Sequence, residues 1–333
     1  MTKDWQNNSR FRVYDISDEL SEIASFIKDC GSFIFVPHIG IDGDDLGSML
    51  ALRHILTSIG KRVFLYSADP IPHQLSSISG IEYFSCDIPN EKIDCMITME
   101  CTSNLRIPET IKPLELSDFI INLDHHKGNR MEAHFHYVDE QASSLGEIIY
   151  YLSKVIGVEF DKNIAEALYL AIVSDTGCFK YSNTSPGTLR IASELLSFGI
   201  DSNLIITRLF SEDPIALVRL KGFLMNNLNI EAEGKLIWAV ITAEQLARYS
   251  LKLSDLQKIP EDLNIVKDSV VLAIFTEIGH DKFKVSLRSK NDGISVRNVA
   301  LKYNGGGHEV AAGCNIEGEN CIEKLVLELS GLF

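Results

Sequence analysis

An apolar segment that leads directly into an acidic loop is the feature that most constrains the fold of this chain. Residues 33–36 are all apolar and predict a short buried strand, and residues 46–56 carry apolar side chains at helical spacing. The loop between them contains His38, Asp42 and Asp44. In an open α/β sheet, a loop that joins a strand to a helix lies at the carboxyl edge of the strands, where ligands bind.

This loop has two interpretations. Carboxylates and an imidazole close together, with Gly43 letting the backbone turn, suit a hard divalent cation. Aspartates at the cap and in the first turn of a helix also stabilise the helix N-terminus without any ligand. The loop alone does not choose between them, and Asp45 is interpreted as an acid of the helix start.

Two later strands and one helix also end in acids or imidazoles. Apolar strands are predicted at residues 93–99 and 119–123, and a helical pattern covers residues 164–173. Loops at one edge of a sheet converge, so these ends are expected to meet. The converging residues are His38, Asp42, Asp44, Glu100, Asp124, His125, His126 and Asp175.

The chemistry of this set favours a particular kind of metal. Carboxylate and imidazole ligands without cysteine suit Mn²⁺ or Mg²⁺ better than a structural zinc ion, and their number is sufficient for two ions. A bridging carboxylate would hold two ions roughly 3.5–4 Å apart, close enough to generate hydroxide and to stabilise charge on a phosphoryl group.

The order of the predicted elements indicates two domains. Strands alternating with helices predict an α/β fold class with a doubly wound, mostly parallel sheet. Consecutive helices at residues 188–198, 203–210 and 214–227 have no strand between them and indicate a helical linker. We expect a catalytic domain at residues 1–200, a linker at 201–228 and a smaller α+β domain at 229–333, with the active site in the cleft between the domains.

Composition limits the partners. The net charge is −15, from 31 basic and 46 acidic residues, and such an acidic body is poorly suited to long nucleic acid. Residues 1–10 are polar and no apolar run has the length of a membrane span, so we expect a cytoplasmic protein without a membrane partner. Seven scattered cysteines form no Cys-x-x-Cys pair and are expected to be reduced, buried thiols.

Taken together, the motifs resemble the DHH phosphoesterase family with its associated C-terminal domain. The similarity extends in order over nearly the whole chain and is greatest with the bacterial oligoribonuclease (nanoRNase) and 3′-phosphoadenosine-5′-phosphate phosphatase branch. The matching motifs are His38-x-x-x-Asp42-x-Asp44-x-x-Gly47-Ser48, Asp124-His125-His126, Asp175-Thr176-Gly177, Gly305-Gly306-Gly307-His308 and Ala311-Ala312-Gly313.

The resemblance implies a site with two manganese ions, for which Mg²⁺ or Co²⁺ are alternatives. One ion would be held by His38 and Asp42, the other by Asp44, His125 and Asp175, with Glu100 as the bridge. Asp124 would orient a ligand imidazole, and His126 would face the scissile phosphate. The positions that match the substrate-binding residues of the family are Ser286, Arg288, Gly305, Gly306, Gly307 and His308.

One residue departs from the pattern of the family. The bridging residue is usually Asp, whereas the strand at residues 93–99 is followed by Glu100, and Asp94 lies at the opposite end of that strand. Because Glu is longer by one methylene, it either bridges after small shifts, binds a single metal, or leaves the site poorly active.

The activity implied by the resemblance is hydrolysis of short oligoribonucleotides, of about two to five residues, to mononucleotides, or of adenosine 3′,5′-bisphosphate to AMP. Linear dinucleotides are included, and a homodimer is compatible with the family. One alternative is an inorganic pyrophosphatase or exopolyphosphatase of the same fold, which would need more basic residues than those found near Arg288 and Lys290. The other alternative is a non-catalytic nucleotide-binding protein, in which Glu100 does not bridge two metal ions.

Overall fold

The apolar segments of the first part of the chain pair into one parallel sheet. The computed structural model describes residues 17–72, 75–291 and 293–333, and the order of strands in this sheet is β3-β2-β1-β4-β5-β6, with every pair parallel. This is the strand order of a doubly wound sheet and confirms the predicted fold class. The strands are β1 (Ser32–Pro37), β2 (Arg62–Tyr66), β3 (Phe84–Ser85), β4 (Ile93–Met99), β5 (Ser117–Asp124) and β6 (Phe135–Val138).

The edge strand β3 was not among the predicted elements, whereas the alternation of His134 and His136 indicated a short strand where β6 lies. β3 has two residues, and β6 has four residues that are exposed or half-buried. Neither forms an apolar run, because an edge strand has only one neighbour and is partly exposed to solvent. Sequence periodicity therefore identified the buried centre of the sheet more clearly than its edges.

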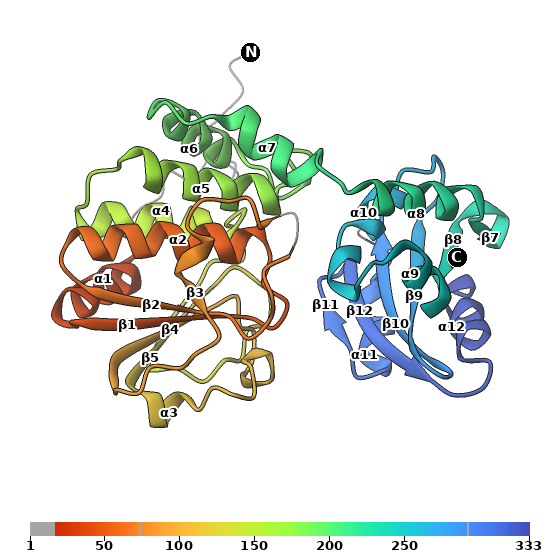
Figure 1. Cartoon of the computed structure of the whole chain (residues 1–333), viewed down its shortest axis with the longest axis horizontal. Helices are drawn as coiled ribbons and strands as arrows, with labels where there is room; N and C mark the ends of the chain where they lie inside the picture. The colour runs from red at the N-terminus through yellow and green to blue at the C-terminus, as the bar shows by residue number, and fades with distance from the viewer. Residues whose placement is uncertain (1–16, 73–74, 292) are drawn as a thin grey trace, which may run out of the picture. The chain divides into compact units, whose positions relative to one another are not determined.

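The two faces of this sheet are covered differently. Figure 1 shows α2, α4 and α5 stacked on one face, with α6 and α7 beyond α5. Loops and the short helix α3 cover the other face. Since β1 is buried on both sides, its residues 33–36 are apolar without alternation. The helices are α1 (Asp18–Asp29), α2 (Gly43–Ser58), α3 (Pro113–Leu116), α4 (Leu145–Ile156), α5 (Lys162–Asp175), α6 (Pro186–Leu196) and α7 (Ser202–Phe210), with 3₁₀ turns η2 (Ile81–Tyr83) and η3 (Asn104–Arg106).

Two glycines allow α2 and α5 to pack closely. A Cβ atom at Gly47 would lie 2.6 Å from the carbonyl oxygen of Ala167 and 2.7 Å from the backbone nitrogen of Ala171. A Cβ atom at Gly43 would lie 2.2 Å from Ser174 Oγ. The absence of side chains at these positions brings the last turn of α5, which carries Asp175, against the first turn of α2.

A second sheet forms the remainder of the fold. Its order is β11-β12-β10-β9-β8-β7, and only the β8–β9 pair is parallel. Helices α11 and α12 pack on one face, and α8, α9 and α10 on the other. The strands are β7 (Asn229–Glu231), β8 (Leu236–Ile241), β9 (Val271–Gly279), β10 (Lys282–Ser289), β11 (Gly306–Gly307) and β12 (Ala311–Glu317). The helices are α8 (Ile215–Asn226), α9 (Ala243–Tyr249), α10 (Ile259–Leu263), α11 (Val296–Lys302) and α12 (Cys321–Ser330), with 3₁₀ turns η4 (Ala232–Gly234) and η5 (Leu253–Leu256).

Contacts divide the chain into two units, Met1–Glu212 and Asp213–Phe333. Helix α7 packs within the first unit and α8 within the second. The polar segment at residues 1–10 lies outside the described residues. None of the helices in the described ranges combines the length and hydropathy needed to cross a membrane.

All seven cysteines are free thiols, and five of them are buried. The expectation of buried thiols is wrong for Cys86, which is exposed, and for Cys178, which is half-buried. Cys86 follows the two-residue edge strand β3 in an exposed loop. Burial of a thiol thus follows its place in the sheet and cannot be assigned from residue type alone.

Candidate metal centre

The first turn of α2 brings two acids into the centre of the first unit. Asp42 is the N-cap of α2, and its Oδ1 accepts hydrogen bonds from the backbone N–H groups of Asp44 (2.9 Å) and Asp45 (3.1 Å). Asp44 is fully buried and accepts hydrogen bonds from the N–H groups of Leu145 (2.6 Å) and Gly146 (3.0 Å), where α4 begins. The acids therefore stabilise helix starts and also face a common site, so the two interpretations of the loop are compatible.

Glu100 lies where the third acid was expected. It follows β4, its side chain is buried, and its φ is 53°, a left-handed conformation that residues other than glycine rarely adopt. Asp94, at the other end of β4, accepts hydrogen bonds from the N–H groups of Gly31 (2.7 Å) and Ser32 (2.9 Å). Asp94 thus joins β4 to the start of β1, which excludes it from the cluster.

The acids and imidazoles converge in overlapping groups. Ligand atoms of His38, Asp42 and Glu100 lie within 4.8 Å of one another, as do those of Asp44, His125 and Asp175. His125 Nε2 lies 3.7 Å from Asp44 Oδ2, 3.8 Å from Asp175 Oδ2 and 4.0 Å from Glu100 Oε2. Glu100 also forms a group with His125 and His126. Its carboxylate therefore lies between the two halves of the cluster.

The adjacent imidazoles are held by different acceptors. His126 Nδ1 lies 2.7 Å from Asp124 Oδ1, whereas His125 Nδ1 lies 3.3 Å from the carbonyl oxygen of Ala142. We expected Asp124 to orient the imidazole of a metal ligand. The imidazole that it contacts is instead that of His126, which was expected to face the scissile phosphate. Although burial opposes both shifts, this hydrogen bond lowers the pKa of Asp124 and raises that of His126. His126 is therefore the imidazole that most readily carries positive charge.

Two asparagines to which sequence reasoning assigned no role hold the acids in place. Asn183 Nδ2 lies 3.1 Å from Asp175 Oδ2 and 2.9 Å from the carbonyl oxygen of Ser143. Asn129 Nδ2 donates to Asp124 Oδ2 at 2.5 Å. No contact was predicted for either asparagine, because only the folded chain reveals these hydrogen bonds.

The electrostatics of the cluster indicate missing positive charge. Burial raises the pKa of Asp44 and of Asp175 to about 7, and burial with nearby carboxyls raises the pKa of Glu100 well above its ordinary value. Burial also lowers the pKa of His38 and His125, which keeps both imidazoles neutral. Glu100 Oε1 and His125 Nε2 are buried without a hydrogen-bond partner among the described residues. Divalent cations would satisfy both the charge and the unpaired atoms.

Comparison with known proteins identifies the family. Residues 32–172 match the model for the DHH family, N-terminal domain, and residues 233–333 match the DHHA1 domain. The bifunctional oligoribonuclease and PAP phosphatase NrnA of Thermus thermophilus is 32% identical over 302 residues, which cover 90% of this chain and 89% of that protein. The chain belongs to the DHH family of phosphoesterases.

Other comparisons agree with this assignment. The protein of the same name from Bacillus subtilis is 28% identical over 329 residues and covers 94% of this chain and 98% of its own length. The structure of an exopolyphosphatase-related protein from Bacteroides fragilis has a TM-score of 0.86 at 23% identity, covering 94% of this chain and 97% of that one, and shows the shared DHH fold.

The DHHA1 unit contains the residues expected to bind substrate. Arg288 lies on β10, and its Nε and Nη2 donate to Glu261 Oε1 at 2.9 and 2.6 Å. Gly305 and Gly307 face β12 so closely that a Cβ atom would lie 2.2 Å from the carbonyl oxygen of Gly313 or 2.4 Å from that of Ala311. Packing against β12 thus accounts for these two glycines, whereas Gly306 has open space around its Cα atom.

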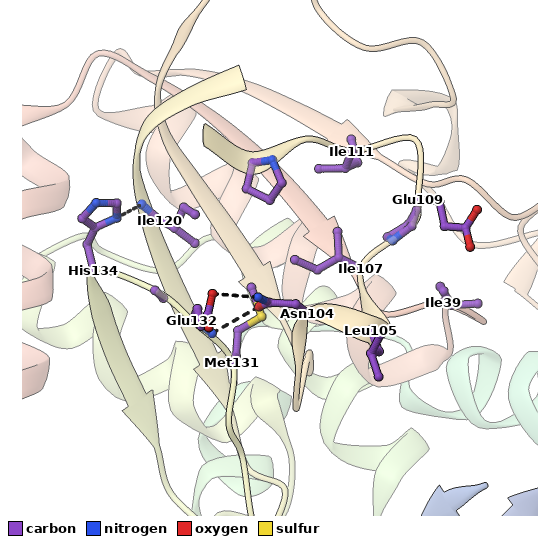
Figure 2. A pocket seen from close by; sticks show the side chains of 13 residues that line it. Ile39, Asn104, Leu105, Ile107, Glu109, Ile111, Ile120, Met131, Glu132 and His134 are labelled. Atoms are coloured by element: carbon purple, nitrogen blue, oxygen red, sulfur yellow. Dashed lines mark hydrogen bonds between the residues drawn. The ribbon is translucent and has the colours of Figure 1, made fainter. Parts of the chain in front are cut away.

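An apolar pocket of about 520 Å³ lies on the face of the DHH unit that loops cover. Figure 2 shows Ile107 and Ile111 among its lining residues, with Asn104 hydrogen-bonded to Glu132. Ile39, directly after His38, contributes to the same lining, but no member of the acidic cluster does. The candidate metal centre and this pocket are therefore separate features of the DHH unit.

Proposed function

We propose that this chain is a divalent-cation-dependent phosphoesterase of short nucleotides. Its reactions would be the hydrolysis of oligoribonucleotides of about two to five residues to mononucleotides and of adenosine 3′,5′-bisphosphate to AMP. The names of relatives that are 28–32% identical over most of the chain support this substrate class. The observation that carries the proposal is the position of Glu100 between two groups of side chains whose types and spacing suit a metal ion.

The donor set supports two cations, for which we propose Mn²⁺. His38 and Asp42 would hold one ion, and Asp44, His125 and Asp175 the other. Glu100 would contribute to both, because its carboxylate lies within 4.8 Å of ligand atoms of His38 and Asp42 on one side and of His125 on the other. Oxygen and imidazole ligands suit Mn²⁺, with Mg²⁺ and Co²⁺ as alternatives. When bound, such ions offset charge on a phosphoryl group and lower the pKa of a water molecule.

The surrounding side chains have distinct tasks in this proposal. Asp124 holds His126 by its Nδ1 atom, so that a protonated His126 can donate a hydrogen bond from Nε2 to a phosphoryl or leaving oxygen. Asn183 fixes Asp175 through its side-chain amide. These contacts order the acids before a substrate arrives, and such preorganisation is what electrostatic catalysis requires.

The DHHA1 unit is proposed to bind the remaining phosphate of the substrate. Arg288 offers a guanidinium group, and Ser286 lies two residues away on the same strand. The backbone from Gly305 to His308 completes this set, because glycines allow N–H groups to approach an anion. The net charge of −15 disfavours long polyanions and is compatible with short ones.

The test is a comparison of substrates with and without metal. Release of mononucleotide from a 5′-phosphorylated diribonucleotide is measured beside adenosine 3′,5′-bisphosphate and pyrophosphate, with chelator and an Asp42→Ala variant as controls. We expect Mn²⁺-dependent turnover of the two nucleotides and its loss in the variant. Turnover of pyrophosphate alone would instead assign an inorganic pyrophosphatase, and binding of nucleotide without any turnover would assign a binding protein.

A further inference from the structure

Asp45 is an acid of the motif loop that neither the cap of α2 nor the proposed cation ligands explain. It lies in the first turn of α2, yet its side chain is 0% exposed. An acid that only favours a helix N-terminus by its charge does so at the surface, as Asp18 does in the first turn of α1. Because an ionised carboxylate loses its hydration on burial, Asp45 keeps a charge only where a neighbouring group compensates for it.

The nearest partner of Asp45 is the first imidazole of the cluster. Asp45 Oδ2 lies 3.3 Å from His38 Nδ1, and the His38 side chain is itself buried. Neither oxygen of Asp45 nor His38 Nδ1 has a hydrogen-bond partner among the described residues, so the 3.3 Å contact is an electrostatic one. The charge of Arg106 also acts on both groups. The two side chains therefore have each other as their closest complementary group.

We propose that Asp45 is a positioning residue that orients His38 for cation binding. In this proposal Nδ1 carries the proton and faces the Asp45 carboxylate, 3.3 Å away, which would leave Nε2 as the nitrogen that binds the cation shared with Asp42. A carboxylate behind a ligand imidazole fixes its tautomer and ring orientation and increases its basicity. The inference rests on the cation-binding part of the proposed function and adds a residue to it.

The first turn of α2 then has three separate tasks. Asp42 caps the helix and faces one half of the cluster, and Asp44 belongs to the other half. Asp45 acts only through His38, and no metal-ligating group of the cluster includes Asp45 itself. Its removal should therefore weaken the cation held by His38 and Asp42 and spare the cation held by Asp44, His125 and Asp175.

The first experiment is calorimetric titration of Mn²⁺ into the wild-type protein, Asp45→Asn and the control Asp18→Asn. We expect Asp45→Asn to weaken one of two sites by about 10- to 100-fold and to leave the other within about twofold. Asp18→Asn should bind as the wild type does. The proposal is wrong if Asp45→Asn leaves both sites at their wild-type affinity, or if it weakens both sites by the same factor.

A double-mutant cycle separates positioning from a purely structural role. In a His38→Gln background, Asp45→Asn should not reduce Mn²⁺ affinity further, because Asp45 acts through the imidazole. A further loss in that background would show that Asp45 supports the fold of the whole cluster and would contradict the proposal. Thermal unfolding in chelator monitors folding of each variant.

The tautomer of His38 is tested in the wild-type protein without turnover. Long-range ¹H–¹⁵N spectra with diamagnetic Mg²⁺ should show the His38 proton on Nδ1. A proton on Nε2 would overturn the inference even if Asp45→Asn does not fold. A different result would contradict the proposed function. If the wild-type protein binds fewer than two Mn²⁺ ions, the two-cation site is wrong, whatever the tautomer of His38.

Discussion

Arg288 and Glu261 form an ion pair in which two guanidinium nitrogens share one carboxylate oxygen, at 2.9 and 2.6 Å. Glu261 Oε2 is buried and has no hydrogen-bond partner among the described residues. If Arg288 binds a substrate phosphate, that phosphate must compete with Glu261 for the same guanidinium. The carboxylate thus occupies a position that an anionic ligand would take.

We predict that Glu261→Gln increases the affinity for adenosine 3′,5′-bisphosphate by about two- to fivefold, because a partly exposed competing charge is removed. Calorimetric titration measures the affinity. Glu317→Gln, which breaks the exposed pair with Lys282 in the same unit, is the matched control and should have no effect. Weaker binding in Glu261→Gln would mean that Glu261 positions Arg288 instead of competing with the ligand.

Glu100 should show opposite effects on activity and on the stability of the metal-free protein. Because burial and the nearby acids raise its folded-state pKa, ionised Glu100 destabilises the metal-free fold at neutral pH. Glu100→Gln should therefore raise the free energy of unfolding in chelator by about 1–2 kcal/mol. It should lower kcat/KM by about 100-fold or more, since the amide is a poor bridge between cations.

Thermal unfolding in chelator and steady-state kinetics with Mn²⁺ test this prediction together. Glu100→Asp is the matched control, since it keeps the charge and shortens the side chain by one methylene. It should retain more activity than Glu100→Gln and show no gain in metal-free stability. An active Glu100→Gln protein with two bound Mn²⁺ ions would contradict the role of this carboxylate.

Whether a residue of the metal centre could be predicted from the sequence depends on its place in the fold. His38, Glu100 and His125 follow buried apolar strands, so the strand pattern and the rule for the carboxyl edge bring them together. The partners of these residues depend on long-range packing. Asn183, which holds Asp175, and Asp45, which was interpreted only as a helix-start acid, required the packed structure. The short edge strand β3 was missed because exposure removes the apolar pattern.

Metal affinity should depend on pH through the buried acids. Asp44 and Asp175 have folded-state pKa values of about 7, so cation binding near neutral pH must release their protons. We predict that the dissociation constant for Mn²⁺ falls by about tenfold per pH unit for each such proton below pH 7. Titration in buffers of different ionisation enthalpy counts the protons released. An affinity that does not change with pH would contradict the raised pKa values.

The carboxyl groups of Asp44 and Asp175 also make the stability of the metal-free protein depend on pH. The folded chain keeps these protons to about pH 7, whereas an unfolded Asp loses its proton near 3.8. The folded state therefore binds more protons between these values, and the contribution of Asp44 and Asp175 to stability declines as pH rises from about 4 to about 7. The lowered pKa values of His38 and His125 act in the opposite sense near pH 6.5. Mn²⁺ should remove the decline, which unfolding in urea at several pH values measures.

The close approach of α2 and α5 should link stability to the geometry of the metal centre. A methyl group at Gly47 would lie 2.6–2.9 Å from backbone and side-chain atoms of Ala167 and Ala171, so Gly47→Ala must separate the helices. We predict a loss of about 1–3 kcal/mol in the free energy of unfolding. Because α5 carries Asp175, Mn²⁺ affinity and kcat should fall as well.

Gly222→Ala in α8, where no atom lies within 4 Å of the added carbon, is the control and should stabilise the protein slightly. If Gly47→Ala has wild-type stability, the helices can move apart at no energetic cost. If the variant is destabilised but binds Mn²⁺ normally, the packing of α2 and α5 does not determine the geometry of the metal centre.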